Sequence, residues 1–191
     1  DTNCLLNLYR CEEHTRVEIL NVMRAISSRS WIPFQVGFEY QKNRRVTIEE
    51  SISSLKKIKS ELEGIYTKNI LGGVKKQLNN ALNEDVIALQ DNLKKSINEF
   101  IKEKIDSRIK NKESISNHDF IRESIDSIIN DNIGCVPTQE RINEIDKDGE
   151  IRYANKIPPG FRDVNKKDIS YFADIKFQNK YGDLYLWKEI I

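Results

Sequence analysis

Apolar side chains recur every three or four residues through the middle of the chain, from about residue 46 to residue 133. This spacing places them on one face of a helix, so it predicts long amphipathic helices that resemble a coiled coil. Two adjacent glycines, Gly72 and Gly73, interrupt the spacing and predict a hinge between two helices. A shorter stripe over residues 117–129 predicts a third helix. We interpret residues 47–134 as a helical insertion; its stripe contains Ile48, Ile52, Leu55, Ile58, Leu62, Ile65, Val74, Leu78, Leu82, Val86, Leu89, Leu93, Ile97, Ile101, Ile105 and Ile109.

The two flanks, residues 1–46 and 135–191, have a mixed pattern of short apolar runs and turn signals. Helical spacing predicts a helix over about residues 12–26 and another from Phe34 to about Arg45, with Pro33 suited to its first turn. In the second flank, the pattern predicts a helix after Pro137 and a final helix that begins near Asp183. We expect the flanks to form one domain that the insertion interrupts.

The charge of the chain bears on which kinds of partner it attracts. The chain has 191 residues, is 32% charged and carries a formal net charge of +1, so it has no global basic field for nucleic acid. Residues 47–135 carry 14 Lys or Arg and 15 Asp or Glu, which is typical of a solvated helical face.

The three cysteines of the chain form no C-x-x-C pair, which favours a reducing compartment. With no spanning helix and no signal peptide in the sequence, we expect a cytoplasmic protein, and the lack of an initiating Met suggests a piece of a longer one.

Three acidic residues lie beside apolar structure, where an unpaired carboxylate is costly. Asp1 precedes an apolar run, Glu39 lies within the predicted helix FQVGFEY, and Asp183 opens the last helix. Carboxylates that converge repel one another, and a hard cation such as Mg²⁺ or Mn²⁺ commonly holds them together. Taken singly, Asp1 fits an ordinary end residue, Glu39 a salt-bridge partner of Lys42 or Arg44, and Asp183 a helix N-cap.

Four blocks of the flanks, in order, resemble the bacterial PIN-like nuclease family that carries a long helical insertion. The blocks are DTNCLLNLYR (1–10), WIPFQVGFEYQKNRR (31–45), IPPGFRDVNKKD (157–168) and YGDLYLWKEI (181–190). They lie on either side of the helical region, where that family has its insertion. The resemblance covers roughly residues 1–46 and 135–191.

The resemblance implies a three-layer α/β/α fold with a central parallel sheet. It implies that Asp1 follows the first strand, that Glu39 lies on the helix after the second strand, and that Asp183 opens a later helix. These three acids would be the catalytic and metal-binding residues, with Asn3 and Asp163 as neighbours of the site. The family's fourth acid and the first strand are expected outside the given sequence.

The implied activity is hydrolysis of RNA or single-stranded nucleic acid with Mg²⁺ or Mn²⁺ as cofactor, since such ions activate water and polarise phosphate. Cationic side chains in the matching blocks are candidates for contacts with the phosphate backbone, although solvated surface charge is the alternative for each of them. They are Arg44, Arg45, Arg162, Lys166 and Lys167. The resemblance also suggests an effector domain of a larger bacterial protein, toxin-like or defensive.

Two other interpretations remain open at the level of sequence. The chain fits a non-catalytic module in which the long helices bind a partner protein or a second copy, while the PIN-like part serves as a scaffold or binds nucleic acid without cutting it. A purely structural coiled-coil segment is a further alternative, against which the mixed flanks argue. Convergence of the three carboxylates distinguishes the nuclease from the module.

Overall fold

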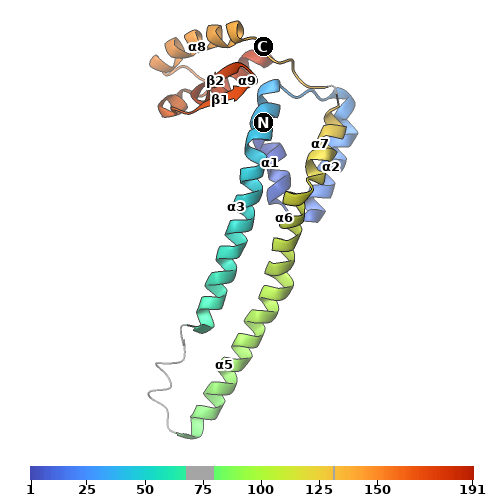
Figure 1. Cartoon of the computed structure of the whole chain (residues 1–191), viewed down its shortest axis with the longest axis vertical. Coiled ribbons are helices and arrows are strands. Elements are labelled where there is room, and N and C mark those ends of the chain that lie inside the picture. Colours follow the sequence, from blue (N-terminus) through green and yellow to red (C-terminus); the bar gives the residue numbers. More distant parts are fainter. Residues whose placement is uncertain (68–79, 131) are drawn as a thin grey trace. The chain divides into compact units, whose positions relative to one another are not determined.

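The computed structural model describes residues 1–67, 80–130 and 132–191, and its chain divides into two compact units. Unit 1 comprises residues 1–44 and 121–191, and unit 2 comprises residues 45–120. Figure 1 labels the elements of both units. The predicted hinge at Gly72 and Gly73, with Val74 and Leu78 beside it, lies outside the described residues.

Unit 1 consists mainly of helices, with one small sheet. Its elements are α1 (Thr2–Arg10), α2 (Glu13–Ile26), η1 (Ser27–Arg29), the beginning of α3 (Phe34–Thr67), α7 (Phe120–Ile129), α8 (Gln139–Ala154), η3 (Phe161–Asn165), β1 (Ile169–Phe172), β2 (Ile175–Gln178), η4 (Asn179–Tyr181) and α9 (Gly182–Ile190). The helices predicted near residues 12–26, after Pro137 and near Asp183 are therefore present as α2, α8 and α9.

The predicted three-layer α/β/α fold with a central parallel sheet is wrong for the described residues. They contain a two-stranded sheet in which β1 pairs antiparallel with β2, from Ile169 opposite Gln178 to Phe172 opposite Ile175. Only two residues separate the strands, and such a short connection permits an antiparallel pair but not a parallel one. Parallel pairing in the described part of the chain is limited to an isolated bridge between Ile32 and Ile133.

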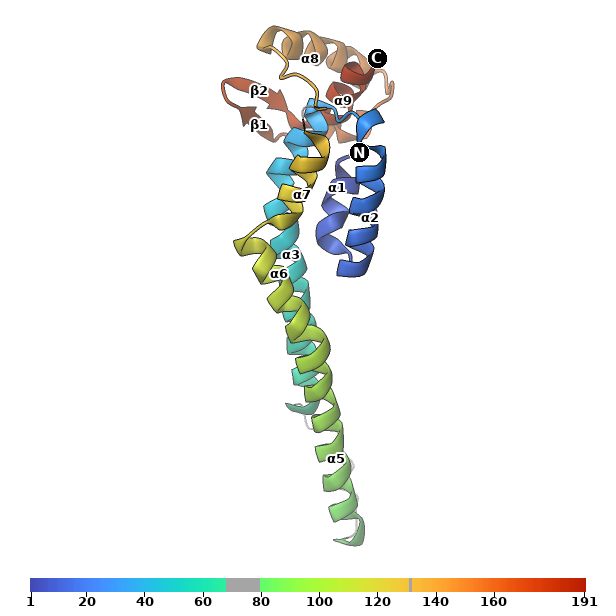
Figure 2. The ribbon, with the colours of Figure 1, turned by 90° about the vertical axis from the view of Figure 1, so that its right-hand side faces the viewer.

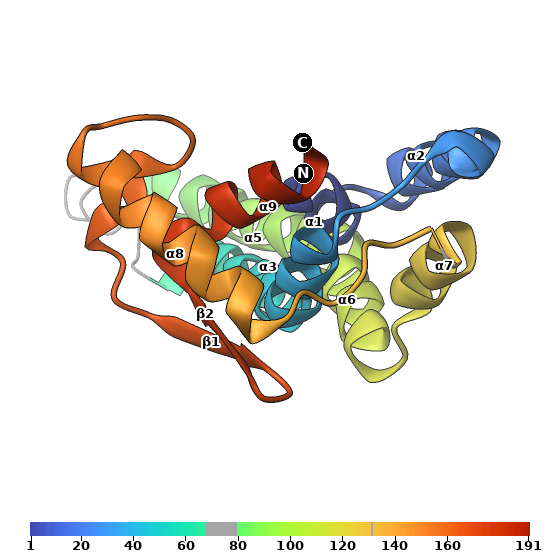
Figure 3. The same cartoon turned by 90° about the horizontal axis from the view of Figure 1, so that it is seen from above.

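One hydrophobic core cluster of unit 1 is formed by side chains from α3, α8, β2, η4 and α9. Figure 3 shows α8 and α9 beside the hairpin of β1 and β2. Burying a large apolar side chain contributes about 1.5–3 kcal/mol, so this cluster fixes α9 against the start of α3. Its buried members are Phe34, Ile142, Ile145, Tyr153, Phe177, Tyr181, Leu184 and Tyr185.

Helices α1 and α2 lie side by side in Figure 2, and polar contacts hold them. The buried Arg16 of α2 donates from Nε to the carbonyl oxygen of Leu8 in α1, at 2.7 Å. The hydroxyl groups of Tyr9 in α1 and Tyr40 in α3 form a buried hydrogen bond of 2.7 Å. Helix α1 is therefore anchored next to the first turns of α3, where Glu39 lies.

Unit 2 contains the remainder of α3, α5 (Asn80–Phe100), the π-helical segment η2 (Ile101–Asp106) and α6 (Ser107–Asn117). Helix α3 continues past Arg45, where the sequence predicted an end, because no glycine or proline interrupts residues 41–63. Ion pairs join α3 to the returning chain: Lys56 Nζ lies 2.9 Å from Glu113 Oε1, and Lys59 Nζ lies 2.7 Å from Asp106 Oδ1. None of the helices in the described ranges has the length and hydrophobicity needed to cross a membrane.

Candidate functional site

Glu39 is the residue of unit 1 at which three helices meet. Its carboxylate is half-buried and accepts two hydrogen bonds. Thr2 of α1 donates from Oγ1 to Oε2 at 2.9 Å, and Gln35, one turn earlier in α3, donates from Nε2 to Oε1 at 2.8 Å. Gly182, the first residue of α9, lies so close that a Cβ added to it would be 2.8 Å from Glu39 Oε1. The position of this carboxylate is therefore set by α1, α3 and α9 together.

Asp183 follows Gly182 in the first turn of α9. The loop before η3 packs against it at Gly160, where an added Cβ would lie 2.9 Å from Asp183 Cβ and 3.2 Å from Asp183 Oδ2. Gly160 has a φ of 76°, a left-handed conformation that suits glycine, so both the backbone and the available space require glycine here. Gly160 thereby brings η3, which carries the predicted neighbour Asp163, close to Asp183.

The ionisable groups around Asp183 shift one another's pKa values. Desolvation raises the pKa of Asp183, the charges of Asp163 and Glu39 raise it further, and Lys166 opposes them. Lys166 Nζ donates to Asp163 Oδ2 at 2.7 Å, and this bond, with the charges of Asp163, Asp183 and Glu39, raises the pKa of Lys166 despite some desolvation. Burial raises the pKa of Tyr153 to about 12, and Asp183 and Asp163 contribute to that rise. Glu39, Asp163 and Asp183 thus share one electrostatic environment with Lys166, and we call these four residues the acidic cluster.

Asp1 and Asn3 lie at the start of α1. Asp1 is the exposed N-cap of this helix, and its Oδ1 accepts a hydrogen bond of 3.0 Å from the backbone N–H of Asn3. The described hydrogen bond from α1 to Glu39 comes from Thr2, the residue between them. The metal-binding role of Asp1 stays a prediction, as does the role of Asn3 as its neighbour.

The five predicted phosphate-binding cations differ in their surroundings. Arg44 is buried, and its Nε donates to Gln41 Oε1 at 2.9 Å, so packing is one evident role for it. Arg45 is exposed and belongs to unit 2. Arg162, Lys166 and Lys167 are exposed in or just after η3, on the segment that also carries Asp163. Contact of any of the five with nucleic acid stays a prediction.

The donor atoms of the acidic cluster suit a hard cation, but their number is small. Within the described ranges, no group of three or more His, Cys, Asp or Glu residues is placed to hold a metal ion. The available ligands are carboxylate oxygens, which Mg²⁺ and Mn²⁺ prefer. A neutral oxygen lies next to them, since Gln35 Oε1 is buried and no described donor reaches it. The chemistry of these donors therefore fits a divalent cation at Glu39 and Asp183.

Sequence reasoning missed three residues that shape this site. Thr2 and Gln35 hold Glu39, and Glu189 at the end of α9 accepts hydrogen bonds from the backbone N–H groups of Phe34 and Gln35, the latter at 3.1 Å. Gln35 could have been found, because it precedes Glu39 by four residues in a predicted helix and so shares its face. No pattern in the sequence pairs Glu189 with the start of α3.

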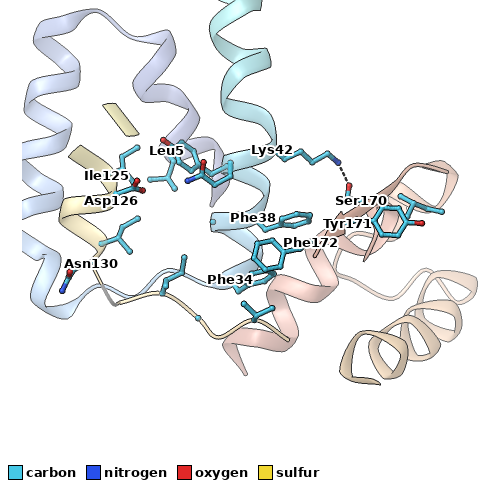
Figure 4. A pocket seen from close by; sticks show the side chains of 18 residues that line it. Leu5, Phe34, Phe38, Lys42, Ile125, Asp126, Asn130, Ser170, Tyr171 and Phe172 are labelled. Atoms are coloured by element: carbon cyan, nitrogen blue, oxygen red, sulfur yellow. Dashed lines mark hydrogen bonds between the residues drawn. The ribbon is translucent and has the colours of Figure 1, made fainter. Parts of the chain in front are cut away.

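A separate pocket of about 850 Å³ lies in unit 1, lined mainly by apolar side chains. Figure 4 shows Phe34 and Phe38 of α3 facing Phe172 of β1, with Lys42 donating to Ser170 at its edge at 2.5 Å. The lining contains none of the residues of the acidic cluster. Because hydrolysis of a phosphodiester needs charged oxygen ligands rather than an apolar wall, we place the candidate site at the acidic cluster and not in this pocket.

Comparison with known proteins agrees with the resemblance noted in the sequence. No curated protein matches the chain, and no solved structure matches it. A family model described as a PIN-like domain matches residues 1–191, the whole of the given sequence. The chain therefore belongs to the PIN-like domain family, in which nuclease activity is the general function.

Proposed function

We propose that the protein is a metal-dependent nuclease that hydrolyses phosphodiester bonds in RNA or single-stranded DNA, with RNA preferred. The observation that carries this proposal is the acidic cluster: in a PIN-like chain, Glu39 of α3 and Asp183 of α9 come together from opposite ends of the sequence. Mg²⁺ or Mn²⁺ is the proposed cofactor.

Each residue of the site has a part in this proposal. Glu39 and Asp183 would hold the cation, with Asp1 as a further predicted ligand. When bound, a divalent cation of this kind polarises a phosphate oxygen and lowers the pKa of water. Asp163 orients Lys166 through their 2.7 Å ion pair, and Lys166, with its raised pKa, keeps a positive charge that attracts the phosphate backbone. Arg162 and Lys167 add cations on the same exposed segment.

The test is cleavage of labelled single-stranded RNA and DNA with Mg²⁺ or Mn²⁺, and with EDTA as a metal-free control. Glu39→Gln and Asp183→Asn should each lower cleavage by at least tenfold, while the exposed hairpin residue Asp174 provides a matched control in Asp174→Asn. The same assay on Asp1→Asn tests the predicted role of Asp1. Undiminished cleavage by Glu39→Gln and Asp183→Asn would contradict the assignment of the site.

The biological setting is part of the same proposal. We propose a cytoplasmic effector domain of a larger bacterial protein, toxin-like or defensive, whose helical region of residues 47–134 binds a partner protein or a second copy. The three cysteines, Cys4, Cys11 and Cys135, are free thiols, as a reducing compartment would leave them.

A second candidate is a module on the same scaffold that interacts with a partner or binds nucleic acid without cutting it. It is favoured by the lack, among described residues, of a group of three acids placed to hold a metal ion. Binding of single-stranded RNA that is unaffected by Mn²⁺, with no cleavage in the assay above, would select this function over the nuclease.

A further inference from the structure

Gln35 is almost fully buried, with 5% of its surface exposed, at the beginning of α3. Its backbone N–H donates to Glu189 Oε2 at 3.1 Å, and its side-chain Nε2 donates to Glu39 Oε1 at 2.8 Å. Residues four apart on a helix face the same side, so this bond is formed within one element and does not depend on the packing of distant segments. Gln35 is thus held at its backbone while its amide reaches one carboxylate.

The carbonyl oxygen of the Gln35 amide is unusual for a buried polar atom. Gln35 Oε1 is buried, and no donor among the described residues reaches it. Most buried polar atoms have a partner, and an unpaired one lowers stability. Rotating the amide by half a turn would not help, because it would bring Oε1 against the acceptor oxygen of Glu39. The orientation is therefore set by Glu39, at the expense of the amide's own oxygen.

An apolar side chain of similar shape would fill this position without leaving an acceptor unpaired. What Gln35 provides that such a side chain cannot is the N–H bond to Glu39. With Thr2 bound to Oε2 and Gln35 bound to Oε1, each oxygen of Glu39 has one donor from the protein. Since a carboxylate oxygen has two acceptor sites, one on each oxygen remains for a cation.

We propose that Gln35 is a positioning residue that orients Glu39 toward the divalent cation, an inference that rests on the proposed nuclease function. Residues that hold a metal ligand from behind commonly change metal affinity by 10- to 100-fold when they are replaced. Gln35 acts on the cation through the hydrogen bond from its Nε2 to Glu39 Oε1, which sets the orientation of that carboxylate.

The experiment measures Mn²⁺ affinity by calorimetry and the melting temperature without metal for the whole protein and its variants. Gln35→Met keeps the length of the side chain and removes the donor. It should weaken Mn²⁺ binding by at least tenfold and leave the melting temperature unchanged or higher. Gln41→Met is the matched control, since Gln41 lies on the same helix and is bonded to Arg44 instead of Glu39, and it should bind Mn²⁺ like the unmodified protein.

A double variant tests whether the effect passes through Glu39. In the Glu39→Ala background, adding Gln35→Met should cause no further loss of affinity, because the two substitutions remove parts of one interaction. Unchanged Mn²⁺ binding by Gln35→Met, an equal loss in the Glu39→Ala background, or a clearly lower melting temperature for Gln35→Met would each overturn the proposal. Failure of the unmodified protein to bind Mn²⁺ would instead overturn the proposed function itself.

Discussion

Thr2 Oγ1 donates a hydrogen bond of 2.9 Å to Glu39 Oε2, and this contact joins the first turn of α1 to α3. Thr2 is buried although its neighbours Asp1 and Asn3 are exposed. The hydroxyl of Thr2 therefore donates to the carboxylate of Glu39 and not to solvent.

Thr2→Val should weaken Mn²⁺ binding by about tenfold or more, because Glu39 loses one of the two donors that fix its orientation. The loss of folding stability should be about 1 kcal/mol, the usual size for one hydrogen bond. Calorimetric titration and urea unfolding provide the two measurements. Thr15→Val, at an exposed position of α2, is the control and should change neither quantity. Equal Mn²⁺ affinities for both variants would contradict a role for Thr2.

Gly160→Ala should destabilise the fold by about 1–3 kcal/mol, because the new Cβ would meet Tyr153 Oη at 2.5 Å and Asp183 Cβ at 2.9 Å in a left-handed backbone. It should also displace Asp183 and reduce Mn²⁺ affinity. Urea unfolding and metal titration measure the two effects.

Replacement of a second glycine should have the opposite effect on folding stability. Gly64 lies within α3, and a Cβ added there would have no neighbour within 4 Å. Gly64→Ala should therefore stabilise the protein by about 0.5–1 kcal/mol through helix propensity alone. If both substitutions had the same effect, the close approach of Gly160 to Asp183 would not be the cause.

The dependence of folding stability on pH should reflect the raised pKa of Asp183. Its pKa is raised above the ordinary value of 3.8, so the unfolded chain releases this proton first as pH rises. The contribution of the carboxyl thus favours the folded state at low pH and is lost as pH increases through the folded-state pKa. In metal-free buffer, Asp183→Asn should become progressively more stable than the unmodified protein from about pH 4 upward, as followed by thermal melting between pH 3 and 7.

The contribution of Asp148 to folding stability should change with pH in the opposite direction. Hydrogen bonds from Lys188, at 2.8 Å, and from Arg152, at 2.9 Å, lower its pKa below 3.8 despite partial desolvation. Its contribution is present above the ordinary value and disappears as pH falls through the lowered one. Asp148→Asn should therefore destabilise the protein at neutral pH and have a smaller effect near pH 3; parallel curves for the two variants would contradict the assigned directions.

Glu189→Gln should destabilise the protein by about 1 kcal/mol, because the negative charge that accepts from the N–H groups of Phe34 and Gln35 also interacts favourably with the N-terminus of α3. The exposed Glu144, paired with Arg141 at 3.2 Å, is the control: Glu144→Gln should change stability by less than about 0.5 kcal/mol. Urea unfolding of both variants decides between a specific cap and a general effect of charge.

Most of the described helices were predictable from this sequence, whereas α1 (Thr2–Arg10) and the sheet were not. The spacing of apolar residues, together with Pro33, Pro137 and Gly182, indicated the starts of α3, α8 and α9 to within two residues. A parallel sheet was expected from resemblance alone. The local signal, two short runs joined by Ala173 and Asp174, permits only an antiparallel hairpin.

Two of the three acids predicted for the site, Glu39 and Asp183, lie together with Asp163 in the structure, whereas Asp1 is the exposed N-cap of α1. Glu39 and Asp183 stood out in the sequence because carboxylates beside apolar runs are costly, but the residues that support them did not. Lys166 was expected to contact phosphate, and the structure adds its ion pair with Asp163. Thr2 and Glu189 act across long stretches of sequence, and no periodic pattern carries such pairings.

Helix α9 touches α3 near both of its own ends, through Gly182 beside Glu39 and through Glu189 at Phe34 and Gln35. One contact would act as a pivot, whereas two act as a brace that removes rotation between the helices. The spacing of Glu39 and Asp183 is then a property of this braced pair. A change in the segment between α8 and η3 would reach the site through Gly160 and the position of Asp183, and not through the packing of α9 on α3.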